Sequence, residues 1–197
     1  DSYIMGTLFV DKLDPQSGTS LEIGSNGDTI TIPSGATIAN SGTATGFGGT
    51  NTPSFSARNS SDQTGINTNS VTKVTFGTED VDTDNAFASS RFTVPSGKAG
   101  KYFLTSTLTV LASSGVTNLR LLSLRIYKNG SQFDGTQIQN DYRNNYSYIG
   151  TVSMSLILDL AVSDYIEIYV RVLDEADGNN STAIGNQCVF SGYKLLW

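Results

Sequence analysis

The stretch TVSMSLILDLAVSDYIEIYVRV, residues 151–172, decides the fold because its apolar and polar side chains alternate along the chain. A two-residue alternation is typical of antiparallel strands that bury one face and expose the other. The apolar positions are Val152, Met154, Leu156, Leu158, Leu160 and Val162, followed by Ile166, Ile168, Val170 and Val172. Polar residues lie between them, among them Ser153, Ser155, Asp159, Glu167 and Arg171. The stretch therefore predicts two half-buried strands.

The same alternation recurs between Pro53 and Trp197. Two further examples are KYFLTSTLTVLA, residues 101–112, and LLSLRIYKNG, residues 121–130, which ends in an Asn-Gly pair typical of a hairpin turn. Their aligned apolar residues are Tyr102, Leu104, Leu108 and Val110 in the first, and Leu122, Leu124 and Ile126 in the second. About eight strands or more fit into this region and no helical period competes, so we expect an all-β, two-sheet sandwich.

The composition bounds the domain count and the partners. The chain has 197 residues and a mass of 21.0 kDa, which suits one domain with an appendage. Its net charge is −6 and its 12 Lys and Arg residues are scattered, so no basic stripe is available for nucleic acid. No apolar run reaches the length of about 18 residues that a membrane span needs. We therefore expect neither nucleic acid as a partner nor membrane insertion.

The residues of acid–base and thiol chemistry are nearly absent. The chain contains no His and a single Cys, which removes the usual general base, the usual metal ligand and any internal disulfide framework. We therefore expect no enzyme. Cys188 lies in the strand-like stretch NQCVFSGY and is predicted to be a buried apolar residue, with an interchain disulfide as the alternative.

The first part of the chain has a different pattern. SGTSLEIGSNGDTITIPSGATIANSG, residues 17–42, repeats glycine turns and short apolar stretches with a period of about eight residues. Its only large apolar residues are Leu21, Ile23, Ile30, Ile32 and Ile38. Burial of so few side chains cannot offset the entropy lost when the whole stretch becomes ordered in an isolated chain. We therefore predict an intertwined β-repeat stem formed with other copies, and a disordered linker is the alternative. The predicted organisation is a stem or attachment segment at residues 1–51 and a head at residues 52–197.

The head also carries an ordered set of short motifs. They run from SFSARNSS at residue 54 through KVTF, DNAF, RFTVPSGKAGKY, LRIYKNG and LILDLAVSDYIEIYV to the terminal CVFSGYKLLW. In this order they resemble the globular head of complement first-component subunits and tumour-necrosis-factor-like ligands. The sequence departs from the family in its stretched PSGKAGKY turn, in Leu104 where a Phe is expected, and in Ser163-Asp164 where the family has Gly-Asp.

This resemblance implies a jelly roll of about ten antiparallel strands that forms a homotrimer. A stem followed by such a head, without a collagen repeat, resembles the fibre and appendage tips of bacteriophages. The implied role is a structural and recognition protein at the virion surface, joined to other virion proteins through the N-terminal stem and binding a host cell-surface glycan or protein. The alternatives are a purely structural decoration or collar trimer, and a secreted complement-like recognition protein.

Acidic loops are the candidates for a cation site. Oxygen-rich loops suit Ca²⁺, but the stretch TEDVDTDN has Asn85 where a helix–loop–helix calcium motif requires Gly, and Arg91 stands where that motif requires Glu. We therefore expect no cofactor and keep calcium as a possibility. The candidate ligands are Asp80, Asp82, Asp84, Asp174 and Asp177.

A loop rich in tyrosine is the candidate for receptor binding. NDYRNNYSY combines Tyr and Arg, which give large, stiff contact areas, with Asn, which supplies donors and acceptors suited to sugars or peptide backbone. The alternative is that its tyrosines stack within a sheet or at the trimer interface. The candidate residues are Tyr142, Arg143, Asn144, Asn145, Tyr146 and Tyr148.

Overall fold

The computed structural model describes residues 12–42, 51–112, 119–142, 147–174, 181–183 and 187–196. These residues form thirteen strands and no helix, so none of them builds a helix that could cross a membrane. The chain divides into two compact units, Asp1–Phe47 and Gly48–Trp197. All the strands belong to the second unit, which we call the head.

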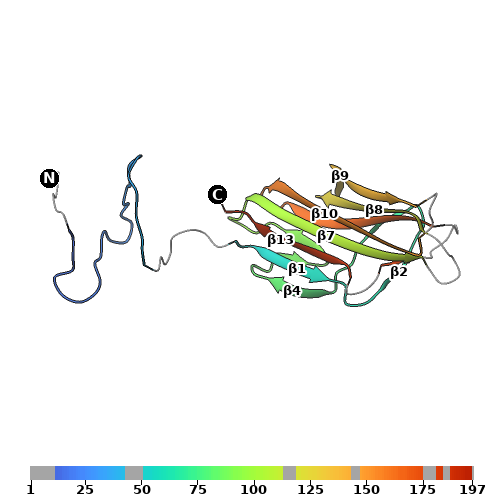
Figure 1. Cartoon of the computed structure of the whole chain (residues 1–197), viewed down its shortest axis with the longest axis horizontal. Helices are drawn as coiled ribbons and strands as arrows, with labels where there is room; N and C mark the ends of the chain where they lie inside the picture. Colours follow the sequence, from blue (N-terminus) through green and yellow to red (C-terminus); the bar gives the residue numbers. More distant parts are fainter. Residues whose placement is uncertain are drawn as a thin grey trace. The chain divides into compact units, whose positions relative to one another are not determined.

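The head consists of two antiparallel sheets, shown in Figure 1, and this confirms the predicted all-β, two-sheet architecture. The seven-stranded sheet contains β1 (Ser54–Arg58), β2 (Gln63–Ile66), β4 (Thr78–Asp82), β7 (Gly100–Ala112), β10 (Ile149–Leu160), β12 (Ser181–Ala183) and β13 (Val189–Lys194). The six-stranded sheet contains β3 (Val71–Lys73), β5 (Phe87–Ala88), β6 (Arg91–Thr93), β8 (Leu119–Lys128), β9 (Ser131–Asp141) and β11 (Tyr165–Asp174).

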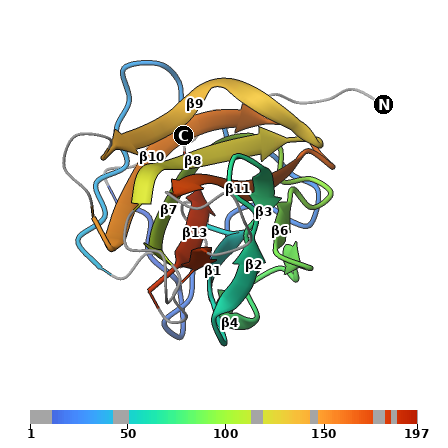
Figure 2. The ribbon, with the colours of Figure 1, turned by 90° about the vertical axis from the view of Figure 1, so that its right-hand side faces the viewer.

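Most strands pair with partners that are distant in the sequence. In the seven-stranded sheet β7 pairs with β10, β12 and β13, and in the six-stranded sheet β11 pairs with β3, β6 and β8. The strands β9 and β10 lie next to one another although they belong to different sheets, as Figure 2 shows. The Asn140 side chain donates a hydrogen bond to the Thr151 carbonyl across this junction at 2.8 Å.

The core lies between the sheets and is aromatic at one end. Phe55 of β1 stacks on Phe92 of β6 with ring centroids 4.6 Å apart, and its other ring neighbours are Phe87 and Phe190. Four rings from different strands thus join the two sheets, and aromatic burial contributes a large share of core stability. Cys188 is also buried in the core, as predicted.

The predicted buried faces are largely confirmed. The four apolar residues predicted for β11 and the three for β8 are fully buried, as are those predicted for β7. Val162 is an exception, because β10 ends at Leu160 and Val162 falls in the following turn, where it is 44% exposed. Leu156 is only partly buried.

The turn of the β8–β9 hairpin is tied to the turn that connects β10 to β11. The predicted Asn129-Gly130 turn is present, with φ of 53° and 80°. The Asn129 side chain donates to Asp164 Oδ1 at 2.7 Å and accepts from the Tyr165 backbone N–H at 2.9 Å. Ser163 stands where the resembled family has Gly, and it adopts a φ of 68°. The backbone therefore keeps a conformation that usually favours glycine, although the residue differs.

The N-terminal residues 12–42 contain turns but no strand. Gly27 and Gly35 adopt positive φ, each within a turn closed by a backbone hydrogen bond, from Asp28 N to Ser25 O at 2.9 Å and from Ala36 N to Pro33 O at 3.1 Å. The five large apolar side chains of the predicted stem are 43–60% exposed, namely Leu21, Ile23, Ile30, Ile32 and Ile38. A single chain thus leaves them in water, and their burial by other copies stays a prediction.

Gly192 supplies a stability test of the core. A Cβ atom at this position would lie 2.6 Å from Leu104 Cδ2, 2.8 Å from the Phe103 carbonyl oxygen and 2.9 Å from Phe55 Cε1. Because the backbone oxygen cannot move aside cheaply, we expect Gly192→Ala to lower the free energy of unfolding by about 1–3 kcal/mol.

Ser191→Ala is the matched control, since Ser191 lies on the same strand and faces outward. We expect that variant to change the free energy of unfolding by less than about 1 kcal/mol. Urea unfolding followed by tyrosine fluorescence measures both. Equal stability of the two variants would contradict the predicted close packing at Gly192.

Candidate functional site

The tyrosine-rich loop is described only at its ends. Tyr142 packs against the core, and its hydroxyl accepts a hydrogen bond from the Asn140 side chain at 3.2 Å. Its backbone N–H donates to the Arg120 carbonyl at 2.8 Å. Tyr148 is 50% exposed. Tyr142 thus supports the fold, Tyr148 is accessible to a partner, and four candidates lie outside the described residues, namely Arg143, Asn144, Asn145 and Tyr146.

The acidic candidates around β4 already have partners within the head. Asp80 accepts from Arg58 Nε at 3.1 Å. Asp82 accepts two backbone N–H groups at the start of β5, at 2.8 and 3.1 Å. Asp84 accepts from the Thr83 hydroxyl at 3.0 Å. Each carboxylate therefore stabilises a different local contact.

The remaining calcium candidates are equally dispersed. Asp174 is buried at the end of β11, and Asp177 lies outside the described residues. Among the residues that the structure describes, no group of three or more His, Cys, Asp or Glu side chains could hold a metal ion. Calcium binding stays a prediction.

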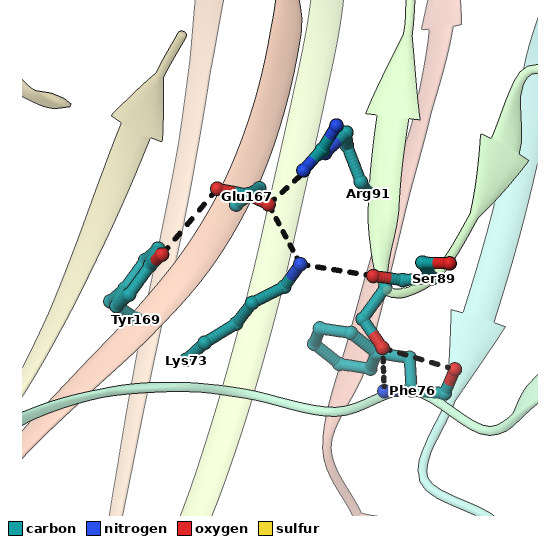
Figure 3. A network of polar contacts seen from close by, with 7 residues as sticks. Lys73, Phe76, Ser89, Arg91, Glu167 and Tyr169 are labelled. Atoms are coloured by element: carbon teal, nitrogen blue, oxygen red, sulfur yellow. Dashed lines mark hydrogen bonds and ion pairs between the residues drawn. The ribbon is translucent and has the colours of Figure 1, made fainter. Parts of the chain in front are cut away.

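A cluster of polar contacts lies on the outer face of the six-stranded sheet. Glu167 of β11 is only 4% exposed, and its Oε1 accepts from Lys73 Nζ at 2.7 Å and from Arg91 Nε at 3.1 Å. Tyr169 approaches Oε2 from the other side at 3.5 Å, as Figure 3 shows. We call these four residues, Lys73, Arg91, Glu167 and Tyr169, the Glu167 cluster. It joins β3, β6 and β11.

A tight turn fixes one side of the Glu167 cluster. Ser89 and Ser90 connect β5 to β6 with φ of 53° and 56°. Lys73 Nζ donates to the Ser89 carbonyl at 3.0 Å, and the Ser90 hydroxyl accepts from the Phe76 backbone N–H at 2.8 Å (Figure 3). The lysine therefore has two oxygen partners that hold its ammonium group in place.

The electrostatics of the cluster favour an ionised carboxylate. Burial alone would raise the pKa of Glu167, but the hydrogen bonds from Lys73 and Arg91 outweigh it and hold the pKa below its ordinary value. Burial, followed by the charge of Glu167, raises the pKa of the Tyr169 hydroxyl. Glu167 is thus an anchor for two cations rather than a group poised for proton transfer near neutral pH.

Aromatic rings surround this anchor. Tyr127 of β8 stacks on Tyr169 with ring centroids 3.9 Å apart and an interplanar angle of 29°. The Arg91 guanidinium carbon lies 4.1 Å from the centre of the Tyr165 ring, a cation–π contact. All these rings are half-buried, so each has one part in contact with the sheet and one part in solvent.

Sequence reasoning placed Glu167 on the polar face of its strand but did not identify the cluster. Its partners are 94 and 76 residues away along the chain, in strands of three residues each. The alternation within YIEIYVRV shows which residues face outward, but it does not indicate which strands pair with this one. A buried carboxylate paired with two cations is therefore visible only once the sheet is assembled.

Of three comparisons with known proteins, only the one with solved structures found matches. No family model and no curated protein matches the sequence. Among solved structures, the globular domain of zebrafish complement 1qA protein aligns with a TM-score of 0.49 and 17% identity, over 73% of this chain and 97% of that one. Murine APRIL aligns with a TM-score of 0.48 and 11% identity, over 72% and 98%. Both are jelly-roll folds of the two kinds named by the sequence resemblance.

The pH dependence of stability tests the Glu167 cluster. A carboxylate with a lowered pKa stabilises the fold above its ordinary value of 4.5, and this contribution is lost as the pH falls through the folded-state value. We expect Glu167→Gln to lower the free energy of unfolding by about 1–3 kcal/mol at neutral pH, because two cations lose their charged acceptor. The difference should shrink as the pH is lowered below the ordinary value.

Glu79→Gln is the control, since Glu79 is an exposed carboxylate on β4. Its unfolding free energy should stay within about 0.5 kcal/mol of the parent at neutral pH. Urea titrations over a pH series measure all three proteins. Parallel pH curves for Glu167→Gln and the parent would show that ionisation of the carboxylate adds nothing to stability.

Proposed function

We propose that this chain is a non-enzymatic, homotrimeric structural and recognition protein of a bacteriophage virion, located at the virion surface as the tip of a fibre or appendage. In this role the head attaches to the host surface, and the N-terminal segment joins other virion proteins. A purely structural decoration or collar trimer and a secreted complement-like recognition protein are the other candidates. The order of a turn-rich stem before a jelly-roll head supports the first candidate.

The observation that carries trimer formation is an exposed apolar row on the outer face of the seven-stranded sheet. The register places Ile157 beside Phe103, and Phe103 beside Tyr193, on three adjacent strands. Ile157 is 57% exposed, Tyr193 is 39% exposed, and the Phe103 and Tyr193 rings are 5.5 Å apart. A contiguous apolar row in water favours burial against another protein surface.

The central part of this outer face is uncharged and its hydroxyl groups are paired, whereas charged residues lie at its margins, where Asp159 stands opposite Lys101 and Arg58 pairs with Asp80. Hydroxyl groups pair across β7 and β10, for example Thr105 with Ser155 at 2.7 Å and Thr107 with Ser153 at 2.8 Å. Such paired hydroxyls can be covered by another copy without leaving a charge unpaired. Together with the exposed apolar residues of the N-terminal segment, this face supports association of identical chains about one axis.

The recognition role is supported by the accessible Tyr148 and by the lack of His, the usual general base of catalysis. Without His, the usual nucleophile–base pairs cannot be assembled. The described carboxylates around β4 serve as hydrogen-bond acceptors within the fold rather than converging on a shared groove. A binding role therefore fits the head better than catalysis.

Light scattering after size exclusion tests the stoichiometry. We expect a species of about 63 kDa, three times the chain mass of 21.0 kDa. Ile157→Lys should shift the protein toward monomer, because the new charge would be buried at the interface. Val71→Lys, an exposed site on the six-stranded sheet, is the control and should leave the mass unchanged. A parent species near 21 kDa at micromolar concentration would rule out the trimer.

Cell binding separates attachment from a purely structural role. Labelled protein should bind a subset of candidate host bacteria and reduce phage adsorption to those cells in a dose-dependent way. Heat-unfolded protein is the control for non-specific adhesion. If no strain is bound and adsorption is unaffected, the attachment role is wrong and the decoration or collar role is favoured.

A further inference from the structure

We propose that the outer face of the six-stranded sheet binds an acidic saccharide, a sugar chain that carries carboxylate or sulfate groups. The proposal names a ligand class for the recognition role above and rests on that role for its biological setting. The contact surface would be the Glu167 cluster together with three residues on the adjoining strand β8 and at the end of β11, namely Arg125, Tyr127 and Arg171.

Strand pairing arranges these residues in a row. Tyr169 of β11 stands opposite Lys73 of β3 on one side and opposite Arg125 of β8 on the other. Since neighbouring strands are about 4.8 Å apart, the row spans about 10 Å, roughly two linked sugar rings. The fully buried Ile168 and Val170 flank Tyr169 along β11, so the row lies on the outer face. The row thus offers an extended binding surface across three strands.

The charge of this face is opposite to that of the whole chain. Lys73, Arg91, Arg125 and Arg171 place four of the twelve cationic residues here, against two carboxylates, Glu167 and Asp141 at the end of β9. The chain as a whole has a net charge of −6. A local excess of positive charge on an acidic protein is complementary to a small anionic ligand.

The arginines keep donor groups available. Among the described contacts, Arg91 uses only Nε toward Glu167, which leaves its two terminal amino groups for another acceptor. Arg125 donates from Nη1 to Gln132 at 3.2 Å, and its buried Nε has no partner in the described part of the chain. Guanidinium groups bind carboxylate and sulfate oxygens through paired donors, so both arginines suit an acidic sugar.

A buried hydroxyl on the same face also lacks a partner. Ser123 of β8 stands opposite Arg171 and is fully buried, and its Oγ has no hydrogen-bond partner among the described residues. An unpaired buried polar atom costs free energy, which a ligand oxygen or a water held beneath a ligand would recover. The unpaired atoms Arg125 Nε and Ser123 Oγ therefore both point to a polar occupant.

Aromatic rings add the apolar contact that sugars require. The stacked pair Tyr127 and Tyr169 presents half-buried rings next to the arginines. Sugar rings carry C–H groups on their faces and hydroxyl groups at their edges, so a tyrosine ring and its hydroxyl can contact both. Phosphate-rich nucleic acid fits less well, because it would extend past this face onto an acidic protein.

The site is held in place before any ligand arrives. Glu167 fixes Lys73 and Arg91 through hydrogen bonds, and all the contact residues lie on paired strands. Binding therefore loses little side-chain entropy, which is the main cost of ordering long cationic side chains. The buried carboxylate acts as a positioning residue for the two cations that would contact the ligand.

Calorimetric titration of the full chain tests the proposal with four probes. The probes are oligogalacturonate, which carries carboxylates, a heparin tetrasaccharide, which carries sulfates, the neutral maltotetraose, and polyglutamate. We expect at least one acidic saccharide to bind at least about tenfold more tightly than maltotetraose and polyglutamate. Binding should weaken when salt is raised from about 50 to about 300 mM. Whichever of the two acidic saccharides binds more tightly shows whether the site prefers carboxylate or sulfate groups.

Arg91→Gln and Arg58→Gln form a matched pair of variants. Each arginine donates from Nε to a carboxylate at 3.1 Å, and their side chains are 41% and 37% exposed, but they lie on opposite sheets. We expect Arg91→Gln to weaken saccharide binding at least about fivefold, and Arg58→Gln to leave it within about twofold. Arg125→Gln, which leaves the Glu167 cluster intact, should weaken binding as Arg91→Gln does. Thermal melting confirms that each variant is folded.

The proposal is overturned by absence of saccharide binding, by equal binding of polyglutamate or maltotetraose, or by equal loss in Arg58→Gln. These outcomes are distinct from failure of the proposed function. Saccharide binding without attachment to any host would leave this inference standing and remove the attachment role. Attachment to host cells that is unaffected by Arg91→Gln and Arg125→Gln would leave the attachment role standing and remove this inference.

Discussion

The stacking of Phe55 on Phe92 joins the two sheets, since one ring belongs to β1 and the other to β6. Phe87 and Phe190 pack around the pair, so that four rings from four strands fill this end of the core. Rings of this size cannot be repacked without opening a cavity, so they fix how the sheets are aligned. Gly192 contributes because only a residue without a side chain lets Phe55 and Leu104 approach the backbone there.

Once the inner faces are fixed in this way, the two outer faces acquire different properties. The face of the seven-stranded sheet has an uncharged central part, with hydroxyl pairs such as Thr105 and Ser155 and an apolar row at Ile157. The face of the six-stranded sheet carries cations and tyrosines around Glu167. An uncharged face suits contact with a second copy, whereas a charged aromatic face suits a polar ligand. This difference is the structural basis for proposing assembly through one sheet and recognition through the other.

The N-terminal residues 12–42 differ from the head because their large apolar side chains are not buried within the chain. Their large apolar side chains remain exposed because the described segment contains no strand and no second layer to cover them. Glycines with positive φ, such as Gly27 and Gly35, produce turns that break the stretch into short pieces. Short pieces with few apolar side chains gain stability only by pairing with other chains, which is the physical basis for proposing a shared stem.

The all-β class, the inner and outer faces of the long strands, and the Asn129-Gly130 turn could be predicted from the amino-acid sequence, because each of these follows from neighbours along the chain. The sequence did not determine where β10 ends, so Val162 was wrongly assigned to a buried face. Only the tertiary structure decided that Lys73 and Arg91 meet Glu167, since they are 94 and 76 residues distant from it. Packing of the whole core determines which strands pair, and an alternating pattern does not predict that pairing.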